Sequence, residues 1–154
     1  MDLFTQDESP KLRNMLCFAL YAASRAMTDA YRPLLEALGL TYPQYLVMIV
    51  LWENEICSVK DLGQLLHLDS GTLSPLLKRL EAVGLIKRQR STQDERIVNI
   101  SLTEQGHELR NQALTIPPQI ACQHGLTADA YTRLLSQLEE LIAALTAASP
   151  NRET

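Results

Sequence analysis

The 154-residue chain lacks several features that mark other classes of protein. No apolar run reaches the roughly 18 consecutive residues that a membrane-spanning helix needs. The amino-terminal segment MDLFTQDESPKLR is acidic and has no apolar core of the kind that a signal peptide carries. Glycine is sparse, with six residues, and leucine-rich runs with helical spacing dominate. We therefore expect a cytoplasmic, mainly helical protein with its own core and no membrane partner.

Metal-ligand spacings are also missing. The chain has three cysteines, Cys17, Cys57 and Cys122, and no CxxC pair. Its three histidines, His67, His107 and His124, show no ligand spacing either. A few scattered cysteines in a cytoplasmic chain do not indicate a structural disulfide framework. We expect neither a metal site nor a cofactor.

Positive charge is scarce overall but concentrated in one segment. The net charge is −4, which by itself argues against a nucleic-acid partner. Residues 78–96, however, contain six cations and three acids and so carry +3, which leaves −7 for the remainder. The six cations are Lys78, Arg79, Lys87, Arg88, Arg90 and Arg96. Binding to phosphates depends on where the positive charge lies, so this segment is a candidate nucleic-acid surface.

Apolar residues recur with helical spacing at both ends of the chain. They predict a first helix over about residues 10–31, then a shorter helix with Pro33 near its start and Gly39 at its end. Residues 41–54 are apolar nearly all round and predict a central buried helix. A further helix, capped by Thr103, is interrupted by Pro117 and Pro118, and Thr127 caps a last one. Apolar residues of that last helix recur at close to heptad spacing, which fits packing against a second subunit.

The middle of the chain reads as a helix, a short turn and a second helix, followed by two strands. Ser58 precedes a two-turn helix, and Asp69 or Ser70 caps the next one, which Gly84 ends. Residues 86–90 and 97–102 read as paired strands joined by the polar turn at 91–95. The expected fold is mainly α with a small β-hairpin wing: a winged helix-turn-helix over about 41–102. We expect residues 1–154 to form one such chain, in which the helices over about 10–31 and 103–147 pair with those of a second copy to form a dimer.

The second helix of this motif has an apolar side and a polar side. One face carries Leu73, Leu76, Leu77, Leu80 and Gly84, and small or cationic residues lie opposite. A recognition helix needs such an apolar back and a polar front that reaches base edges. A solvated charged face is the alternative, but the cation-rich wing that follows favours double-stranded DNA. The candidate DNA-binding residues are Ser70, Thr72, Ser74, Pro75, Lys78 and Arg79 in the helix, and Arg90, Asp94 and Arg96 in the wing.

Three segments resemble the winged-helix repressors of the MarR family: GLTYPQYLVMIVLWE, DSGTLSPLLKRLEAVGLIKR and DERIVNISLTEQG. The resemblance covers roughly residues 12 to 147 in the same order. It implies a transcriptional repressor, not an enzyme, that binds a pseudo-palindromic operator. It also implies a homodimer joined through the first and last helices.

Two further segments, LCFALYAAS and AYRPLLEALGLTYPQY, resemble one branch of that family, the organic-hydroperoxide sensors of the OhrR type with two cysteines. By this resemblance Cys17 is the peroxide-reactive thiol, and Tyr31 and Tyr42 hydrogen-bond to it. Cys122 then forms a disulfide with the oxidised thiol of the other subunit. An organic hydroperoxide is the implied inducer.

Physical reasoning agrees with this assignment at several points. The thiolate is the reactive form of cysteine, and tyrosine hydroxyls can donate hydrogen bonds to it. Cys17 and Tyr31 lie about 21 Å apart on one straight helix, so a contact between them requires the partner's helix. Cys122 lies between two prolines and Gly125, which suggests a joint between helices. Apolar neighbours such as Phe18 favour an organic peroxide over hydrogen peroxide.

Other interpretations remain open at this point. The same fold could serve a regulator that a phenolic small molecule releases from DNA, or the chain could be a thiol peroxidase. We interpret Cys57 as a small buried residue and Trp52 as part of the core. Tyr21 and Tyr45 are expected in the core or in a pocket wall.

Overall fold

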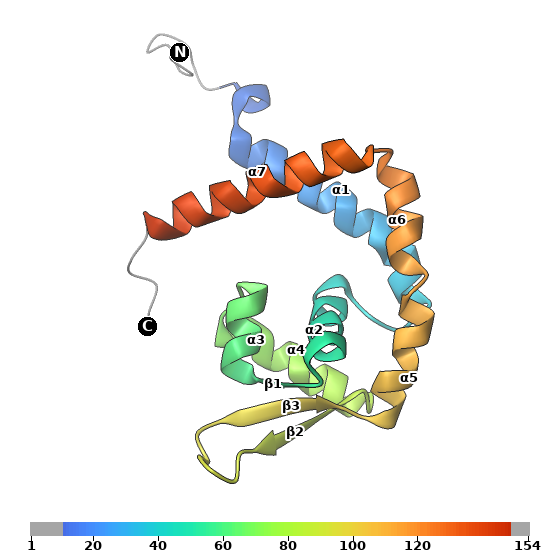
Figure 1. Cartoon of the computed structure of the whole chain (residues 1–154), viewed down its shortest axis with the longest axis vertical. Coiled ribbons are helices and arrows are strands. Elements are labelled where there is room, and N and C mark those ends of the chain that lie inside the picture. The colour runs from blue at the N-terminus through green and yellow to red at the C-terminus, as the bar shows by residue number, and fades with distance from the viewer. Residues whose placement is uncertain (1–10, 149–154) are drawn as a thin grey trace. The chain divides into compact units, whose positions relative to one another are not determined.

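The computed structural model describes residues 11–148, so the predicted helix start at Pro10 lies outside the described residues. The chain forms two compact units, residues 1–116 and residues 117–154. Within residues 11–148, every helix is too short or too polar to cross a membrane. Figure 1 shows the order of the helices and strands along the chain.

The first long helix continues further than predicted. After a 3-10 turn, η1 (Leu12–Asn14), helix α1 (Leu16–Glu36) runs without a break through Pro33. The prediction of two helices separated near Tyr31 is therefore wrong. Pro33 removes one backbone hydrogen bond, but it lies on the exposed side, while the nearby Leu35 is fully buried and holds the last turn in place. Gly39, with φ +68°, follows the helix as expected.

Helix α2 (Tyr42–Asn54) is the central helix of the first unit, as predicted. Seven of its thirteen residues are buried, which explains why its sequence shows no polar face. The Gln44 side chain reaches back over the start of the helix, where its Oε1 accepts hydrogen bonds from the Thr41 N–H at 2.9 Å and from the Thr41 hydroxyl at 3.1 Å. These bonds satisfy polar groups that the first turn leaves without helical partners.

The winged helix follows, and its fold class is as predicted. Helices α3 (Val59–Leu66) and α4 (Ser70–Ala82) are joined by a short turn, and strands β2 (Ile86–Arg90) and β3 (Val98–Leu102) form the hairpin. A third strand, β1 (Ile56–Ser58), pairs antiparallel with β3, so the order is β1-β3-β2. The sequence prediction missed β1 because three residues are too few to show alternation. In Figure 1 the turn between β2 and β3 extends beyond α3 and α4.

The start of α4 is fixed by Asp69, one of the two predicted caps. Its carboxylate accepts a hydrogen bond from the Thr72 N–H at 2.8 Å and one from the Thr72 hydroxyl at 3.2 Å. The Thr72 backbone bond, followed by the side-chain bond, lowers the pKa of Asp69 below its ordinary value. On the apolar face of α4, Leu73, Leu77 and Leu80 are fully buried, while Leu76 and, just beyond the helix, Gly84 are half-buried. The predicted two-sided character of this helix is confirmed.

A close junction joins the winged helix to α5 (Glu104–Ala113). The Trp52 Nε1–H donates to the Gly106 carbonyl at 2.9 Å, and the Thr103 hydroxyl donates to the Gly84 carbonyl at 2.6 Å. A Cβ atom at Gly106 would lie 2.1 Å from the backbone oxygen of Leu85. Only glycine allows this approach, although the position lies inside a helix where glycine is otherwise unfavourable.

The second unit contains the rest of α6 (Ile116–His124) and α7 (Ala128–Ala147). The predicted interruption before the prolines is confirmed, but Pro117 and Pro118 lie in the first turn of a separate helix. Proline is tolerated there because N–H groups of a first turn have no helical acceptor. The sequence suggested that Cys122 lies at a joint between helices. The structure instead places it within the last turn of α6. Thr127 caps α7 by accepting from the Ala130 N–H at 3.2 Å.

We predict that Gly106→Ala destabilises the protein. Alanine normally favours a helix, but here its Cβ must displace the Leu85 backbone, and overpacking of this kind costs about 1–3 kcal/mol. Urea unfolding followed by circular dichroism measures the change. Glu108→Ala, at an exposed position of α5, is the control and should leave the midpoint nearly unchanged. An unchanged midpoint in Gly106→Ala would contradict the close approach.

The Asp69 cap predicts a pH-dependent contribution to stability. Because the folded-state pKa of Asp69 is lowered, its charge stabilises the fold above the unfolded pKa of about 3.9, and this contribution is lost as the pH falls through the folded pKa. The free-energy difference between the parent and Asp69→Ala should therefore be larger at pH 7 than at pH 3. Asp69→Asn keeps an acceptor without a titrating group, so its difference from Asp69→Ala should not narrow with acid. Equal parent-to-alanine differences at both pH values would refute the assignment.

Candidate functional site

The polar side of α4 is accessible along its length. Ser70, Pro75, Lys78 and Arg79 are exposed, as is Thr72, whose hydroxyl is engaged with Asp69. Ser74 is half-buried. The structure thus gathers the predicted helix residues on one side, with small side chains near the amino end and cations further along.

The turn of the wing is held by its own short polar side chains. The Ser91 hydroxyl accepts from the backbone N–H of Gln93 at 3.2 Å, and Asp94 Oδ1 accepts from the backbone N–H of Arg96 at 3.0 Å. The Arg90 guanidinium donates to the Glu95 carbonyl at 3.0 Å. Asp94, which was predicted to contact DNA, therefore shapes the turn that presents the Arg96 side chain.

The six cations of residues 78–96 differ in how they are used. Arg88 on β2 forms an ion pair with Glu81 on α4, with Nε and Oε2 3.3 Å apart. This pair joins the end of α4 to the wing, and both side chains are partly exposed, so its strength is modest. Among the described residues, Lys78, Arg79, Lys87 and Arg96 have no ion-pair partner. Four of the six cations therefore remain available for an external anion.

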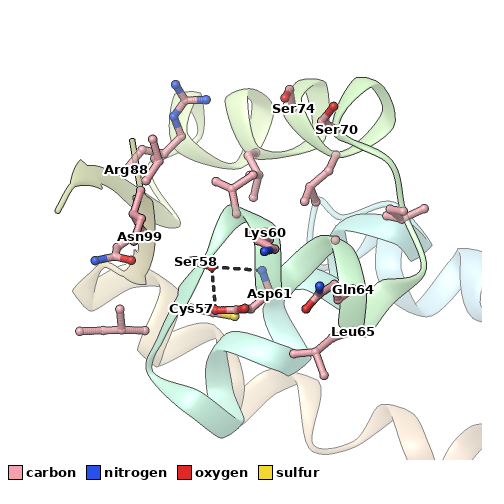
Figure 2. A pocket seen from close by; sticks show the side chains of 18 of the residues that line it. Cys57, Ser58, Lys60, Asp61, Gln64, Leu65, Ser70, Ser74, Arg88 and Asn99 are labelled. Atoms are coloured by element: carbon pink, nitrogen blue, oxygen red, sulfur yellow. Dashed lines mark hydrogen bonds between the residues drawn. The ribbon is translucent and has the colours of Figure 1, made fainter. Parts of the chain in front are cut away.

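An open groove of about 1230 Å³ lies between α3, the first half of α4 and the sheet. Figure 2 shows Ser70 and Ser74 on α4, Arg88 and Asn99 on the strands, and Lys60 and Gln64 on α3 around it. At its base the Ser58 hydroxyl donates to Asp61 Oδ2 at 2.7 Å and accepts from the Asp61 N–H at 3.1 Å. The sequence prediction did not include residues of α3 or β1 in this surface, since nothing in their spacing indicates that they border the wing.

The three cysteines lie in different environments. Cys17, in the first turn of α1, and Cys122, in α6, are exposed in the single chain. Cys57 is only 8% exposed, as predicted, and lies on β1. Burial first, and the nearby Asp61 carboxylate second, raise the pKa of the Cys57 thiol above its ordinary value. Cys57 is therefore the least suited of the three to react as a thiolate near neutral pH.

Tyr31 and Tyr42 come together although they belong to different helices. Their ring centroids lie 4.9 Å apart at 56°, and both side chains are half-buried. Cys17 and Tyr31 lie on the same uninterrupted helix, which separates them by about 21 Å within one chain. The structure therefore assembles the tyrosine pair in one chain but does not bring Cys17 of that chain to it.

Large apolar side chains are exposed on both α1 and α7. Leu16, Phe18 and Tyr21 on α1 are each more than 40% exposed, and so are Leu135 and Ile142 on α7. Tyr21 was expected in the core or in a pocket wall, but its side chain is 57% exposed in the single chain. Tyr45 and Trp52 are buried, as predicted. Among residues 11–148 no group of three metal-ligating side chains is present.

Comparison with known proteins gives the family. Residues 29–113 match the family model described as transcriptional regulator SarA/Rot. The chain is 51% identical over 135 residues to the organic hydroperoxide resistance transcriptional regulator of Bacillus subtilis strain 168, covering 88% of this chain and 92% of that protein. These proteins are regulators of transcription and not enzymes, as expected for this chain.

Solved structures of AbfR, a protein of Staphylococcus epidermidis, are similar over most of the chain. Reduced AbfR bound to DNA superposes with a TM-score of 0.71 at 36% identity, covering 87% of this chain and 94% of AbfR. Disulfide-formed AbfR gives a TM-score of 0.61 at 37% identity, covering 85% and 92%. With the helix-turn-helix, the wing and these matches together, the chain belongs to the MarR/SarA family of winged-helix transcriptional regulators.

Proposed function

We propose that the chain is a DNA-binding repressor that an organic hydroperoxide releases from its operator by oxidising Cys17. The observation that carries this proposal is the division of the cysteines into two exposed thiols on candidate interface helices and one buried thiol. The names of the relatives support it, since one is a regulator of organic hydroperoxide resistance and the other has been solved both reduced on DNA and with a disulfide formed.

The DNA contact is made by α4 and the wing. The helix enters the major groove with Ser70, Thr72, Ser74, Pro75, Lys78 and Arg79. The wing adds Arg90 and Arg96, and Asp94 holds the turn that carries Arg96. Arg96 suits a narrow minor groove, where the potential is most negative. The DNA backbone between the major and the minor groove passes the protein groove that lies between α3, α4 and the sheet. Because the target is chromosomal DNA, the chain acts in the cytoplasm.

The partner of the chain is a second copy. Exposed apolar faces on α1 and α7 are the surfaces that a dimer buries, and apolar burial stabilises such an interface by roughly 25 cal/mol per Å². A symmetric dimer places two recognition helices about one helical turn of DNA apart. It also supplies the partner's α1 to the pair formed by Tyr31 and Tyr42, which a thiol of the same chain does not reach.

The chemistry proceeds in two balanced steps. The Cys17 thiolate attacks one oxygen of the hydroperoxide, the S–O bond forms as the O–O bond breaks, and the alkoxide takes a proton to leave as an alcohol. Tyr31 and Tyr42 of the partner subunit donate hydrogen bonds to the thiolate. The other subunit's Cys122 then attacks the sulfenic sulfur, the S–S bond forms, and water leaves. The thiols are oxidised by two electrons and the peroxide is reduced.

A disulfide between Cys17 and Cys122 requires Cα atoms within about 7 Å of one another. Formation of this bond between subunits draws α6 of one chain toward α1 of the other. The attached winged helices then lose the spacing that matches successive major grooves.

Arg96→Ala should weaken operator binding about 5- to 100-fold without unfolding the protein, because it removes the arginine presented at the tip of the wing. The salt dependence of binding should become shallower in the same variant. Fluorescence anisotropy with a labelled operator duplex at several salt concentrations measures both effects. Arg110→Ala, an exposed arginine of α5, is the control. If both variants bind alike, the wing does not contact DNA.

The cysteine variants should separate oxidation of the sensor thiol from formation of the disulfide between subunits. Cys17→Ser should bind DNA and stay bound after one equivalent of organic hydroperoxide. Cys122→Ser should still lose the Cys17 thiol but form no covalent dimer on a non-reducing gel. Cys57→Ser should behave as the parent, because its thiol is buried. Release of Cys17→Ser by peroxide, or release of the parent by an aromatic acid but not by peroxide, would contradict the mechanism.

A further inference from the structure

Four aromatic side chains of the first unit form a continuous column between α1 and α2. The ring centroids of Tyr31 and Tyr45 lie 6.1 Å apart, and those of Tyr45 and Trp52 lie 6.2 Å apart in an edge-on arrangement. Tyr42 joins the column at its Tyr31 end. All three spacings are in the range where aromatic pairs stabilise one another beyond simple burial.

The column is half-buried at the Tyr31 end and buried over the rest of its length. Tyr31 and Tyr42 are half-buried, Tyr45 is 4% exposed and Trp52 is 9% exposed. Burial, with a smaller contribution from Tyr42, raises the pKa of Tyr45, so its hydroxyl stays protonated. Tightly packed rings have few alternative positions, and a displacement of Tyr31 must therefore be taken up by Tyr45.

The buried end of the column is tied to the base of the wing. The Trp52 Nε1–H donates to the Gly106 carbonyl, and Gly106 lies directly against the Leu85 backbone, immediately before β2. The Thr103 N–H, just after β3, also donates to the Leu85 carbonyl at 3.1 Å. Trp52 thus contacts the point where both strands of the wing meet α5.

We propose that Tyr45 and Trp52 are positioning residues that hold Tyr31 for the sensor thiol and connect the thiol site to the base of the wing. This inference rests on the proposed function, since it assumes that Tyr31 is a partner of Cys17. Tyr45 fixes the ring of Tyr31, and Trp52 fixes Tyr45 through its bond to Gly106. Movement of Tyr31 when Cys17 is oxidised then reaches the wing through two rings and one hydrogen bond.

Trp52 is the only tryptophan of the chain and reports on the column directly. Reduced protein is mixed with one equivalent of tert-butyl hydroperoxide, and Trp52 emission is followed while quenched samples are assayed for the Cys17 thiol by mass spectrometry. We expect the emission to change with the same time course as the oxidation. Oxidation of Cys17 with no change in emission overturns this inference but leaves the sensor thiol in place.

The variants test the column one residue at a time. Tyr45→Leu removes the middle ring and should slow oxidation of Cys17 about three- to tenfold, whereas Tyr45→Phe keeps the ring and should restore the parent rate. Met48→Leu is the matched control, because Met48 is fully buried in α2 but is not part of the column. Equal rates in Tyr45→Leu and the parent, or equal slowing in Tyr45→Leu and Met48→Leu, overturn the positioning role.

Trp52→Phe tests the connection to the wing. It keeps a ring but removes the donor to Gly106, so oxidation of Cys17 should slow less than in Tyr45→Leu. The ratio of DNA affinities between reduced and oxidised protein should fall by about 2- to 12-fold, the range for one lost hydrogen bond. The probe is a duplex selected from a random pool by the reduced parent protein. An unchanged ratio overturns the connection.

Cys17→Ser separates failure of this inference from failure of the proposed function. Peroxide should leave Trp52 emission unchanged in that variant. If the emission changes as it does in the parent, Cys17 is not the sensor, and both the proposed function and the inference that rests on it are overturned.

Discussion

The close approach of Gly106 to the Leu85 backbone is the constraint on which the rest of the first unit depends. It allows the Trp52 indole to donate to the Gly106 carbonyl and sets the direction in which α5 leaves the wing. Thr103 reinforces the same point through its hydroxyl, which donates to the Gly84 carbonyl. Four elements, α2, β2, β3 and α5, therefore meet at one place where no side chain can be inserted. In the proposed coupling, a displacement of α2 moves the base of the wing through this junction, because closely packed interiors transmit strain.

Electrostatics explains how an acidic protein presents a surface for DNA. The excess of acid lies outside residues 78–96, and within that segment only Arg88 has an ion-pair partner among the described residues. The Arg88 pair with Glu81 braces α4 against the wing, and Arg90 donates to the Glu95 carbonyl, so two cations serve the architecture and four remain available. Asp94 has a similar structural part, because its carboxylate shapes the turn that carries Arg96. The acids Glu81 and Asp94 thus position cations of the proposed DNA surface.

The environment of each cysteine follows from the element on which it lies. Cys57 lies on the buried side of β1, opposite the exposed Ile56, and its burial raises the pKa of its thiol. Cys17 and Cys122 lie on helices whose surfaces the single chain leaves open. In the proposed dimer those surfaces meet a second copy, which brings the tyrosine pair of one chain to the thiol of the other. Reactivity would then depend on assembly, since neither chain has a complete site by itself.

Local patterns in the sequence determined much of this structure. Helical spacing, the caps at Ser58, Asp69, Thr103 and Thr127, and the alternation in β3 were sufficient for the winged helix-turn-helix, because each is a short-range property of the chain. The spacing of Cys17 and Tyr31 on one helix likewise excluded a contact within the chain. Only the tertiary structure revealed β1, the continuation of α1 through Pro33, the Glu81–Arg88 pair and the column from Tyr31 to Trp52. Each of these depends on contacts between different elements, or on packing that outweighs a local preference, and no local pattern records which side chains of two elements will meet.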